Sequence, residues 1–220
     1  MDTSTKLKGF DFFDRASEQE INEIAKSCVC KAYSTNTIIL SEGDVSNNVY
    51  FVVKGKLQVY LSNQSGKVII IKDLYEGESF GELGVVCNTV RSANIVTRSE
   101  TVLIAIASLS YKNYYQNNLI AAQSVINILA SSLSKLTKDY ESLALDDLSH
   151  RLVRLLFDLS KNEGGELIVS HTHNEIANRV ASSRESVTRA ISVMKNSELL
   201  ETKEYGIRLT EKLIGMYAQV

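Results

Sequence analysis

The decisive stretch of this sequence runs Gly77-Glu-Ser-Phe-Gly-Glu-Leu-Gly-Val-Val-Cys-Asn-Thr-Val-Arg-Ser-Ala93. Its glycines, at positions 77, 81 and 84, permit tight turns and close approach of the backbone to a ligand. Glu82 can accept hydrogen bonds from a vicinal or 2′ hydroxyl, Arg91 offers a planar fork to a phosphate, and Ser92 adds a hydroxyl and a backbone N–H. These groups suit a nucleotide with one anionic phosphodiester, although a glycine-rich loop in a β-protein is more often just a loop.

Short strands surround this segment, from about Asn36 to Ala107. β-branched and alternating apolar runs recur about every ten residues, and glycine-containing turns separate them. The runs are residues 37–40, 49–53, 57–61, 68–71 and 101–106. This rhythm predicts a jelly-roll-like β-sandwich or barrel. A capping box formed by Ser17 and Glu20 predicts a short helix before the strands.

An apolar stripe with alternating spacings of three and four residues follows the strands. Its members are Leu119, Ala122, Ile126, Leu129, Leu133, Leu136, Tyr140 and Leu143. This heptad pattern predicts one long helix with a packing face. The face could pack on the β-domain of the same chain, but the repeat fits a second helix better, so we favour a parallel homodimer.

The remainder of the chain has the pattern of a winged helix-turn-helix. Residues 148–159 form an amphipathic helix, Gly164-Gly165 turn the chain, and 167–169 form a short strand. Two further helices follow, the first opened by a capping box at Thr172 and Glu175. Residues 199–210 predict two strands around a turn.

The second of these helices has one apolar and one polar face. Val187, Ile191 and Met194 mark its inward face. Arg184, Glu185, Thr188 and Arg189 fall on the other side, at the end where a recognition helix meets base edges. This local patch matters because the net charge of −2 does not indicate a nucleic-acid-binding protein, and residues 146–220 hold 10 Lys+Arg against 11 Asp+Glu.

Several classes of protein are disfavoured by composition. No apolar run approaches 18 residues, which argues against a membrane span, and residues 1–13 lack the apolar region of a signal peptide, so we expect a cytoplasmic protein. Cys28, Cys30 and Cys87 are expected to be ordinary buried or half-buried thiols. Three thiols cannot supply a four-cysteine iron–sulfur cluster, and the absence of histidine before His150 disfavours haem, a metal site or a metal-dependent enzyme in the β-domain.

The segment from Gly77 to Ala93 resembles the phosphate-binding cassette of the cyclic-nucleotide-binding domain, found in the bacterial cyclic-AMP receptor protein (CRP/FNR) family and in cyclic-nucleotide-dependent kinases. Gly81-Glu82-Leu83-Gly84 and Arg91-Ser92-Ala93 match its core. The resemblance implies a ligand site of Gly81, Glu82, Leu83, Arg91 and Ser92, in which Glu82 binds the ribose 2′-OH while Arg91 and Ser92 bind the cyclic phosphate. In that family two residues of the dimer helix contact the base.

The two positions that match the base contacts are Leu136 and Thr137. Thr137 keeps the hydroxyl of the second family residue, whereas Leu136 replaces the first and also lies on the heptad stripe. The choice between adenine and guanine is therefore open. The resemblance favours cyclic AMP as effector, with cyclic GMP, a cyclic dinucleotide or no ligand as alternatives.

The pattern Glu-Ile-Ala-x-x-Val-Ala-x-Ser-Arg-Glu-x-Val-x-Arg, from Glu175 to Arg189, is similar to the helix-turn-helix of the same family. The resemblance assigns Arg184 and Arg189 to guanines and Glu185 to a cytosine amino group of a TGTGA half-site. The remaining candidate DNA contacts are Ser183, Thr188, and the phosphate-binding candidates His173 and Asn174. Ala181 stands where glycine is common, so either it has φ > 0, with about 1–2 kcal/mol of strain, or the turn is relaxed.

We therefore predict an α+β protein with a cyclic-nucleotide-binding β-roll (residues 1–108), a dimerisation helix (109–145) and a winged helix-turn-helix (146–220). The expected function is a cyclic-AMP-responsive transcription regulator, not an enzyme, that acts as a homodimer on a palindromic TGTGA-like site. Its expected partners are double-stranded DNA, the cyclic nucleotide and RNA polymerase, without a membrane. A signalling subunit that binds nucleotide but not DNA is the rival that Arg184, Glu185 and Arg189 disfavour.

Overall fold

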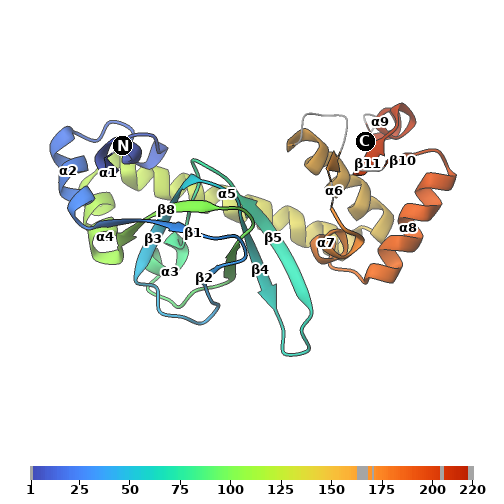
Figure 1. Cartoon of the computed structure of the whole chain (residues 1–220), viewed down its shortest axis with the longest axis horizontal. Helices are drawn as coiled ribbons and strands as arrows, with labels where there is room; N and C mark the ends of the chain where they lie inside the picture. Colours follow the sequence, from blue (N-terminus) through green and yellow to red (C-terminus); the bar gives the residue numbers. More distant parts are fainter. Residues whose placement is uncertain (1, 163–167, 170, 204–205, 218–220) are drawn as a thin grey trace. The chain divides into compact units, whose positions relative to one another are not determined.

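The computed structural model describes residues 2–162, 168–169, 171–203 and 206–217 (Figure 1). The chain divides into two compact units. The first comprises Met1–Gly66 and Ile71–Lys135, and the second comprises Lys67–Ile70 and Leu136–Val220. The division falls within one long helix, α5 (Leu119–Leu145).

Two four-stranded sheets form the predicted β-roll, and the strand pairs whose register is described are antiparallel. One sheet has the order β1 (Cys28–Tyr33), β8 (Thr101–Ala107), β3 (Asn48–Lys54) and β6 (Ser79–Phe80). The other has the order β2 (Ile38–Leu40), β7 (Asn94–Thr97), β4 (Leu57–Ser62) and β5 (Val68–Leu74). The core of the roll includes Val52, Leu57, Leu74, Phe80 and Leu103, all nearly fully buried.

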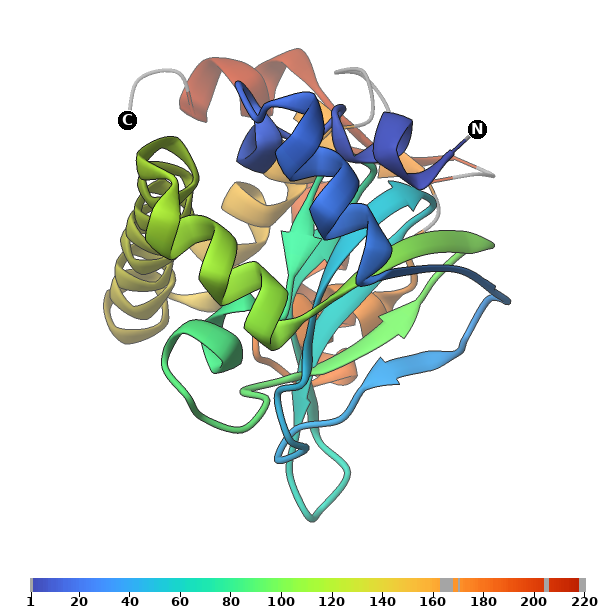
Figure 2. The ribbon, with the colours of Figure 1, turned by 90° about the vertical axis from the view of Figure 1, so that its left-hand side faces the viewer.

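Helices cover the outer face of the β1-β8-β3-β6 sheet. They are α1 (Thr3–Leu7), a 3₁₀ turn (Asp11–Phe13), α2 (Glu18–Lys26) and α4 (Ser108–Asn117). Figure 2 shows blue α2 and green α4 against the sheet. Phe12 stacks on Tyr111 at 4.6 Å between ring centroids. The predicted capping box is confirmed, since Ser17 N donates to Glu20 Oε2 and Glu20 N to Ser17 Oγ.

The predicted dimerisation segment, 109–145, contains most of α4 and all of α5 rather than one helix. The chain leaves the helical conformation at Asn118 (φ −128°, ψ 111°), between α4 and α5. The Oδ1 atom of Asn118 then accepts hydrogen bonds from the N–H groups of Ile120 and Ala121, which caps α5. The heptad stripe therefore begins at the start of its own helix.

Helix α5 is long and apolar enough to cross a membrane by length and composition alone, with a mean hydropathy of 1.3. This differs from the prediction based on contiguous apolar runs, because α5 mixes leucine and isoleucine with serine and asparagine. Its heptad residues Leu119, Ile126 and Tyr140 are exposed in the single chain, whereas Ala121 and Val125 are buried in the first unit. An apolar stripe on an otherwise polar helix is typical of helix–helix packing rather than of a membrane span.

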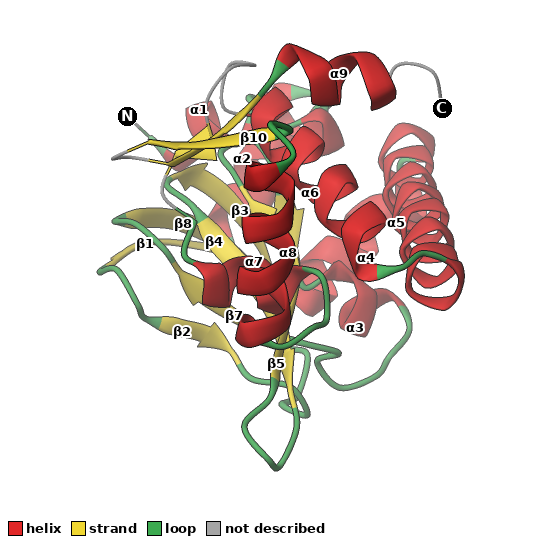
Figure 3. Cartoon of the chain, turned by 90° about the vertical axis from the view of Figure 1, so that its right-hand side faces the viewer, coloured by secondary structure: helices red, strands yellow, loops and turns green. Residues whose placement is uncertain are grey.

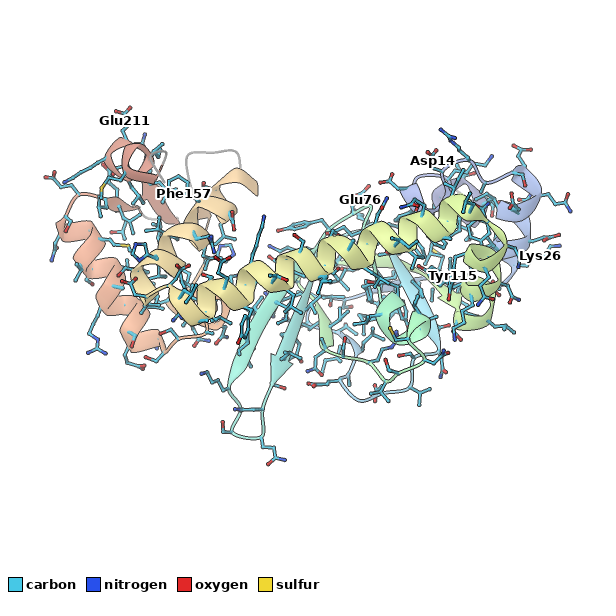
Figure 4. The ribbon with its side chains drawn as sticks, turned by 180° about the vertical axis from the view of Figure 1, so that it is seen from behind. Asp14, Lys26, Glu76, Tyr115, Phe157 and Glu211 are labelled. Atoms are coloured by element: carbon cyan, nitrogen blue, oxygen red, sulfur yellow. The ribbon has the colours of Figure 1, made fainter. Side chains whose placement is uncertain are left out.

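The second unit carries the predicted helix-turn-helix (Figure 3). Its elements are α6 (Leu148–Asn162), β9 (Ile168–Val169), α7 (His173–Arg179), α8 (Arg184–Asn196), β10 (Leu200–Lys203), β11 (Gly206–Leu209) and α9 (Glu211–Tyr217). The three strands form one antiparallel sheet, the wing, in the order β10-β11-β9. Leu152, Leu156 and Val187 are fully buried at the core, and Phe157 on α6 packs against it (Figure 4). The turn predicted at Gly164-Gly165 lies outside the described residues.

Candidate nucleotide-binding and DNA-binding sites

The cassette folds as a strand, a sharp turn and a short helix, rather than as the predicted loop. Strand β6 leads into Gly81, whose φ of 84° is left-handed, and α3 (Glu82–Val86) follows at once. A side chain at Gly81 would place its Cβ 2.7 Å from Arg91 Nη1, and one at Gly84 would collide with Ser46. Both glycines are therefore required for close packing around the cassette.

Arg91 lies in the interior of the cassette with only 4% of its surface exposed. Its Nη1 donates to the carbonyl of Gly81 at 2.7 Å and its Nη2 to the carbonyl of Asn48 at 2.6 Å. Its Nε is buried without a hydrogen-bond partner, and no carboxylate among the described residues forms an ion pair with it. Burial lowers the pKa of the guanidinium, against the opposing effects of Tyr50, Glu82 and Asp44.

A buried charge without a counter-ion is unfavourable unless something compensates it. The two carbonyl groups hold the Arg91 side chain in place but do not neutralise it. The chemistry of the site therefore suits an anionic group that reaches the guanidinium, such as a phosphate.

Glu82 opens α3 beside this arginine. Its Oε2 atom is buried and lacks a hydrogen-bond partner. Burial raises the pKa of the carboxyl, while its own backbone N–H and the charges of Lys72 and Arg91 act in the opposite direction. A buried carboxylate oxygen with an unfilled acceptor position fits a ligand hydroxyl, so the residues present fit a ribose next to a phosphate.

The structure brings Gly81, Glu82 and Arg91 together, whereas Ser92 and Leu83 have exposed side chains at the edge of the same segment. Leu136 and Thr137 lie on α5 in the second unit, so their contact with a base stays a prediction.

Three further groups near the cassette were not predicted from the sequence. The Asn48 carbonyl is separated from Arg91 by 43 residues, Lys72 acts on Glu82 from β5, and Tyr50 acts on Arg91 from β3. Lys72 shares a strand face with the buried Leu74, because side chains two apart point the same way. Only strand alternation could have indicated this position.

The turn between α7 and α8 is strained, as one of the two sequence interpretations proposed. Ala181 has φ of 52°, in the left-handed region that is unfavourable for alanine. Ser183 caps α8, because its Oγ accepts a hydrogen bond from Ser186 N. The capping box of α7 is also confirmed, with Thr172 N donating to Glu175 Oε2 and Glu175 N to Thr172 Oγ1.

Helix α8 has the predicted inward face, with Val187, Ile191 and Met194 buried. Arg184, Glu185 and Arg189 are exposed. Thr188, predicted on the exposed face, is only half-exposed, because its hydroxyl donates to the Arg184 carbonyl and contacts His173. Asn174 on α7 is exposed.

The carboxylate of Glu185 stays charged in this setting. A hydrogen bond from its own backbone N–H, and a second from the Ser183 side chain, lower the pKa of Glu185. The nearby charges of Arg184 and Arg189 act in the same direction. An ionised carboxylate is an acceptor only, which suits the amino group of cytosine.

Cysteine environments differ from the prediction. Cys28 is half-buried, and burial raises the pKa of its thiol to about 11. Cys30 and Cys87 are exposed, so the expectation of buried or half-buried thiols was wrong for these two. In the part of the chain that the structure describes, no three His, Cys, Asp or Glu side chains gather into a possible metal site.

Two family models match the chain. The cyclic nucleotide-binding domain matches residues 30–118, and the Crp-like helix-turn-helix domain matches residues 150–213. Together they cover the cassette and the α7–α8 motif.

Relatives and solved structures agree with these matches. The cAMP-activated global transcriptional regulator CRP of Haemophilus influenzae is 29% identical over 186 residues, which cover 79% of this chain and 80% of that protein. A crp/fnr-family regulator structure from Eubacterium rectale has a TM-score of 0.81 at 19% identity, covering 97% of this chain and 100% of that chain. The c-di-GMP-responsive global regulator CLP of Xanthomonas campestris has a TM-score of 0.73 at 24% identity, covering 88% and 99%.

These matches confirm the predicted family and fold class. The chain has a cyclic-nucleotide-binding domain, a long helix and a DNA-binding helix-turn-helix, and it belongs to the CRP/FNR family of transcription regulators, which are not enzymes.

Proposed function

We propose that this protein is a homodimeric transcription regulator whose DNA binding is controlled by cyclic AMP at the cassette. The observation that carries the proposal is the buried guanidinium of Arg91, which is held by two carbonyl groups and has no carboxylate partner among the described residues. The cyclic phosphate would neutralise this charge, Ser92 would add a donor, and Glu82 would accept from the ribose 2′-OH. Gly81 and Leu83 would form the wall of the site.

Cyclic AMP is preferred because one buried arginine suits a ligand with one phosphate, and because the Haemophilus influenzae relative is cAMP-activated. The alternative is another cyclic nucleotide. CLP of Xanthomonas campestris has the same fold and responds to c-di-GMP. Leu136 supports this alternative, since it replaces a polar base contact by an apolar residue, and Thr137 alone keeps a hydroxyl.

The proposed DNA target is a palindrome with TGTGA-like half-sites. Arg184 and Arg189 would each donate to a guanine, and Glu185 would accept from a cytosine. Ser183, His173 and Asn174 would contact the phosphate backbone and fix the register, and Thr188 would hold His173 next to the DNA. The two half-sites would lie about 34 Å apart, as expected for two recognition helices related by a twofold axis.

The exposed heptad stripe of α5 supports the homodimer. A parallel partner helix would bury Leu133 and Leu136, which are 65% and 64% exposed in the single chain. We further propose that the nucleotide stabilises one arrangement of the two recognition helices, which requires different ligand affinities for the two states. The site of action would be the cytoplasm, with RNA polymerase as a partner and no membrane.

Calorimetric titration of the full-length protein with cyclic AMP, cyclic GMP and c-di-GMP tests the ligand. Arg91→Gln removes the charge, and Arg98→Gln is the matched control, because Arg98 bonds Gln58 and Asn36 in the same β-roll. We expect cyclic AMP to bind the wild type and the Arg98 variant but not the Arg91 variant. Tighter binding of cyclic GMP or c-di-GMP would make that nucleotide the effector instead of cyclic AMP. Absence of binding of all three would refute the cassette as a nucleotide site.

A further inference from the structure

One side-chain contact joins the first residue of α7 to the recognition helix. His173 Nδ1 lies 2.9 Å from Thr188 Oγ1, and Thr188 Oγ1 donates to the Arg184 carbonyl at 2.9 Å. A hydroxyl has a single proton, so Thr188 accepts from His173 when it donates to Arg184. The Nδ1 atom therefore carries the imidazole proton, and Nε2 is the nitrogen that is protonated when the ring becomes charged.

This contact suits both charge states of the ring. A neutral imidazole and an imidazolium both present an N–H at Nδ1, so protonation at Nε2 leaves the bond to Thr188 intact. His173 is half-exposed, and its ring is held against the turn of α8 that carries Arg184. Protonation thus adds a positive charge next to the DNA-binding surface without rearranging it.

The charged residues close in sequence to His173 and Thr188 lie on both helices. On α8 they are Arg184 and Glu185 in the first turn and Arg189 next to Thr188. On α7, Glu175 is held by the N–H and hydroxyl of Thr172, and Arg179 lies at the last residue. Arg184 and Arg189 are exposed, and a further positive charge on this surface is favourable beside a phosphate backbone.

We propose that His173 is a positioning and phosphate-binding residue that makes DNA affinity depend on pH. The neutral ring fixes α7 against α8 through Thr188, and the protonated ring also donates from Nε2 to a DNA phosphate. This inference rests on the proposed DNA contact of the helix-turn-helix and adds that pH regulates the affinity of that contact.

The direction of the effect follows from linkage. If the charged ring binds DNA better, affinity increases as pH falls. Glu185 does not oppose this trend between pH 8 and pH 5.5, because hydrogen bonds lower the pKa of its carboxyl from the ordinary value. A homodimer gains one phosphate contact per subunit, so the slope of log affinity against log salt becomes steeper by about 2.

The test is fluorescence anisotropy of a labelled TGTGA-palindrome duplex with full-length protein at saturating cyclic AMP. Affinity is measured between pH 8 and pH 5.5 at several salt concentrations. We expect the wild type to bind about tenfold more tightly at the lower pH, with the steeper salt slope. His173→Arg should bind tightly at every pH, and His173→Gln should stay at the wild-type level of pH 8.

Four control variants separate this role from a structural one. His150→Gln and His171→Gln replace the other histidines of the chain and should keep the wild-type pH profile. Thr188→Val should reduce the pH dependence because the ring loses its acceptor, and Thr188→Ser should restore it. A wild type without pH dependence, or an unchanged profile in His173→Gln, would overturn the inference. Absence of duplex binding at every pH would instead refute the proposed DNA target.

Discussion

The cassette and helix α8 both carry arginines for which we propose a phosphate-bearing ligand, but they hold them in opposite ways. Arg91 is 4% exposed and is fixed by the carbonyl groups of Gly81 and Asn48. Arg184 and Arg189 are exposed at the first turns of α8. A fixed, buried guanidinium is already arranged for one small ligand, whereas exposed side chains can adjust to a long polymer. Stability and binding should therefore be coupled at Arg91 and separate at Arg184.

The largest expected effect is that of Arg91→Gln. The substitution leaves two buried carbonyl groups without their donors, at a cost of about 1–3 kcal/mol each, and we expect this cost to exceed the gain from removing a buried charge. The free energy of unfolding of the first unit should fall by about 2–4 kcal/mol, with loss of nucleotide binding. Urea unfolding can be followed by tyrosine fluorescence, because the chain has 10 Tyr and no Trp. Arg98→Gln is the control, and equal stability of the two variants would contradict the structural role of Arg91.

A smaller effect, confined to DNA, is expected for Arg184→Ala. Loss of a bidentate contact to guanine should weaken binding of a TGTGA-type duplex by about 1–3 kcal/mol. The free energy of unfolding should be unchanged, because the Arg184 side chain is exposed. Competition between specific and random duplexes measures this loss. If Arg184→Ala weakened both duplexes equally, Arg184 would be a phosphate contact rather than a base contact.

Ala181→Gly should stabilise the second unit by about 1 kcal/mol. Glycine removes the strain of φ 52° at the turn, partly offset by its greater entropy in the unfolded chain. Thermal unfolding of the variant beside the wild type measures the change. A destabilised variant would indicate that the Cβ of Ala181 makes packing contacts worth more than the strain.

The smallest effect is expected for Glu82→Gln, which should slightly stabilise the ligand-free protein and weaken its binding of nucleotide. Burial raises the pKa of Glu82 in the folded protein. The free energy of unfolding therefore decreases as pH rises from the pKa of Glu82 in the unfolded chain to its higher pKa in the folded protein. The ligand-free variant should therefore be slightly more stable than the wild type at pH 7 and not at pH 3.5, while it binds nucleotide less well. A stability difference that did not change with pH would contradict the burial of this carboxyl.

The sequence predicted the parts of the fold that have strong local patterns. Strands β2, β3, β4, β5 and β8, both capping boxes and the inward face of α8 follow from periodicity and turn residues. It missed β1, β6 and β7. Strand β1 is exposed at most positions and so lacks an alternating pattern, and β6 has only two residues.

The candidate sites divide in the same way. Glu82 and Arg91 stand close together in the chain and could be assigned from local sequence. The hydrogen bond from Arg91 to the Asn48 carbonyl joins residues that are 43 positions apart. The contact between His173 and Thr188 joins residues that are 15 positions apart. Such contacts depend on tertiary packing, which no local pattern encodes. The break at Asn118 was missed because no glycine or proline marks it, although asparagine is a favoured cap residue.

The central claim is that ligand binding at Arg91 is coupled to DNA binding at α8. The most direct test is the affinity of the full-length protein for a TGTGA palindrome, with and without saturating cyclic AMP, at one fixed salt concentration. We predict that cyclic AMP tightens binding of the wild type by about 5–150-fold, the usual range of such coupling, and leaves Arg91→Gln unchanged. Equal affinity of the wild type with and without cyclic AMP would contradict the account.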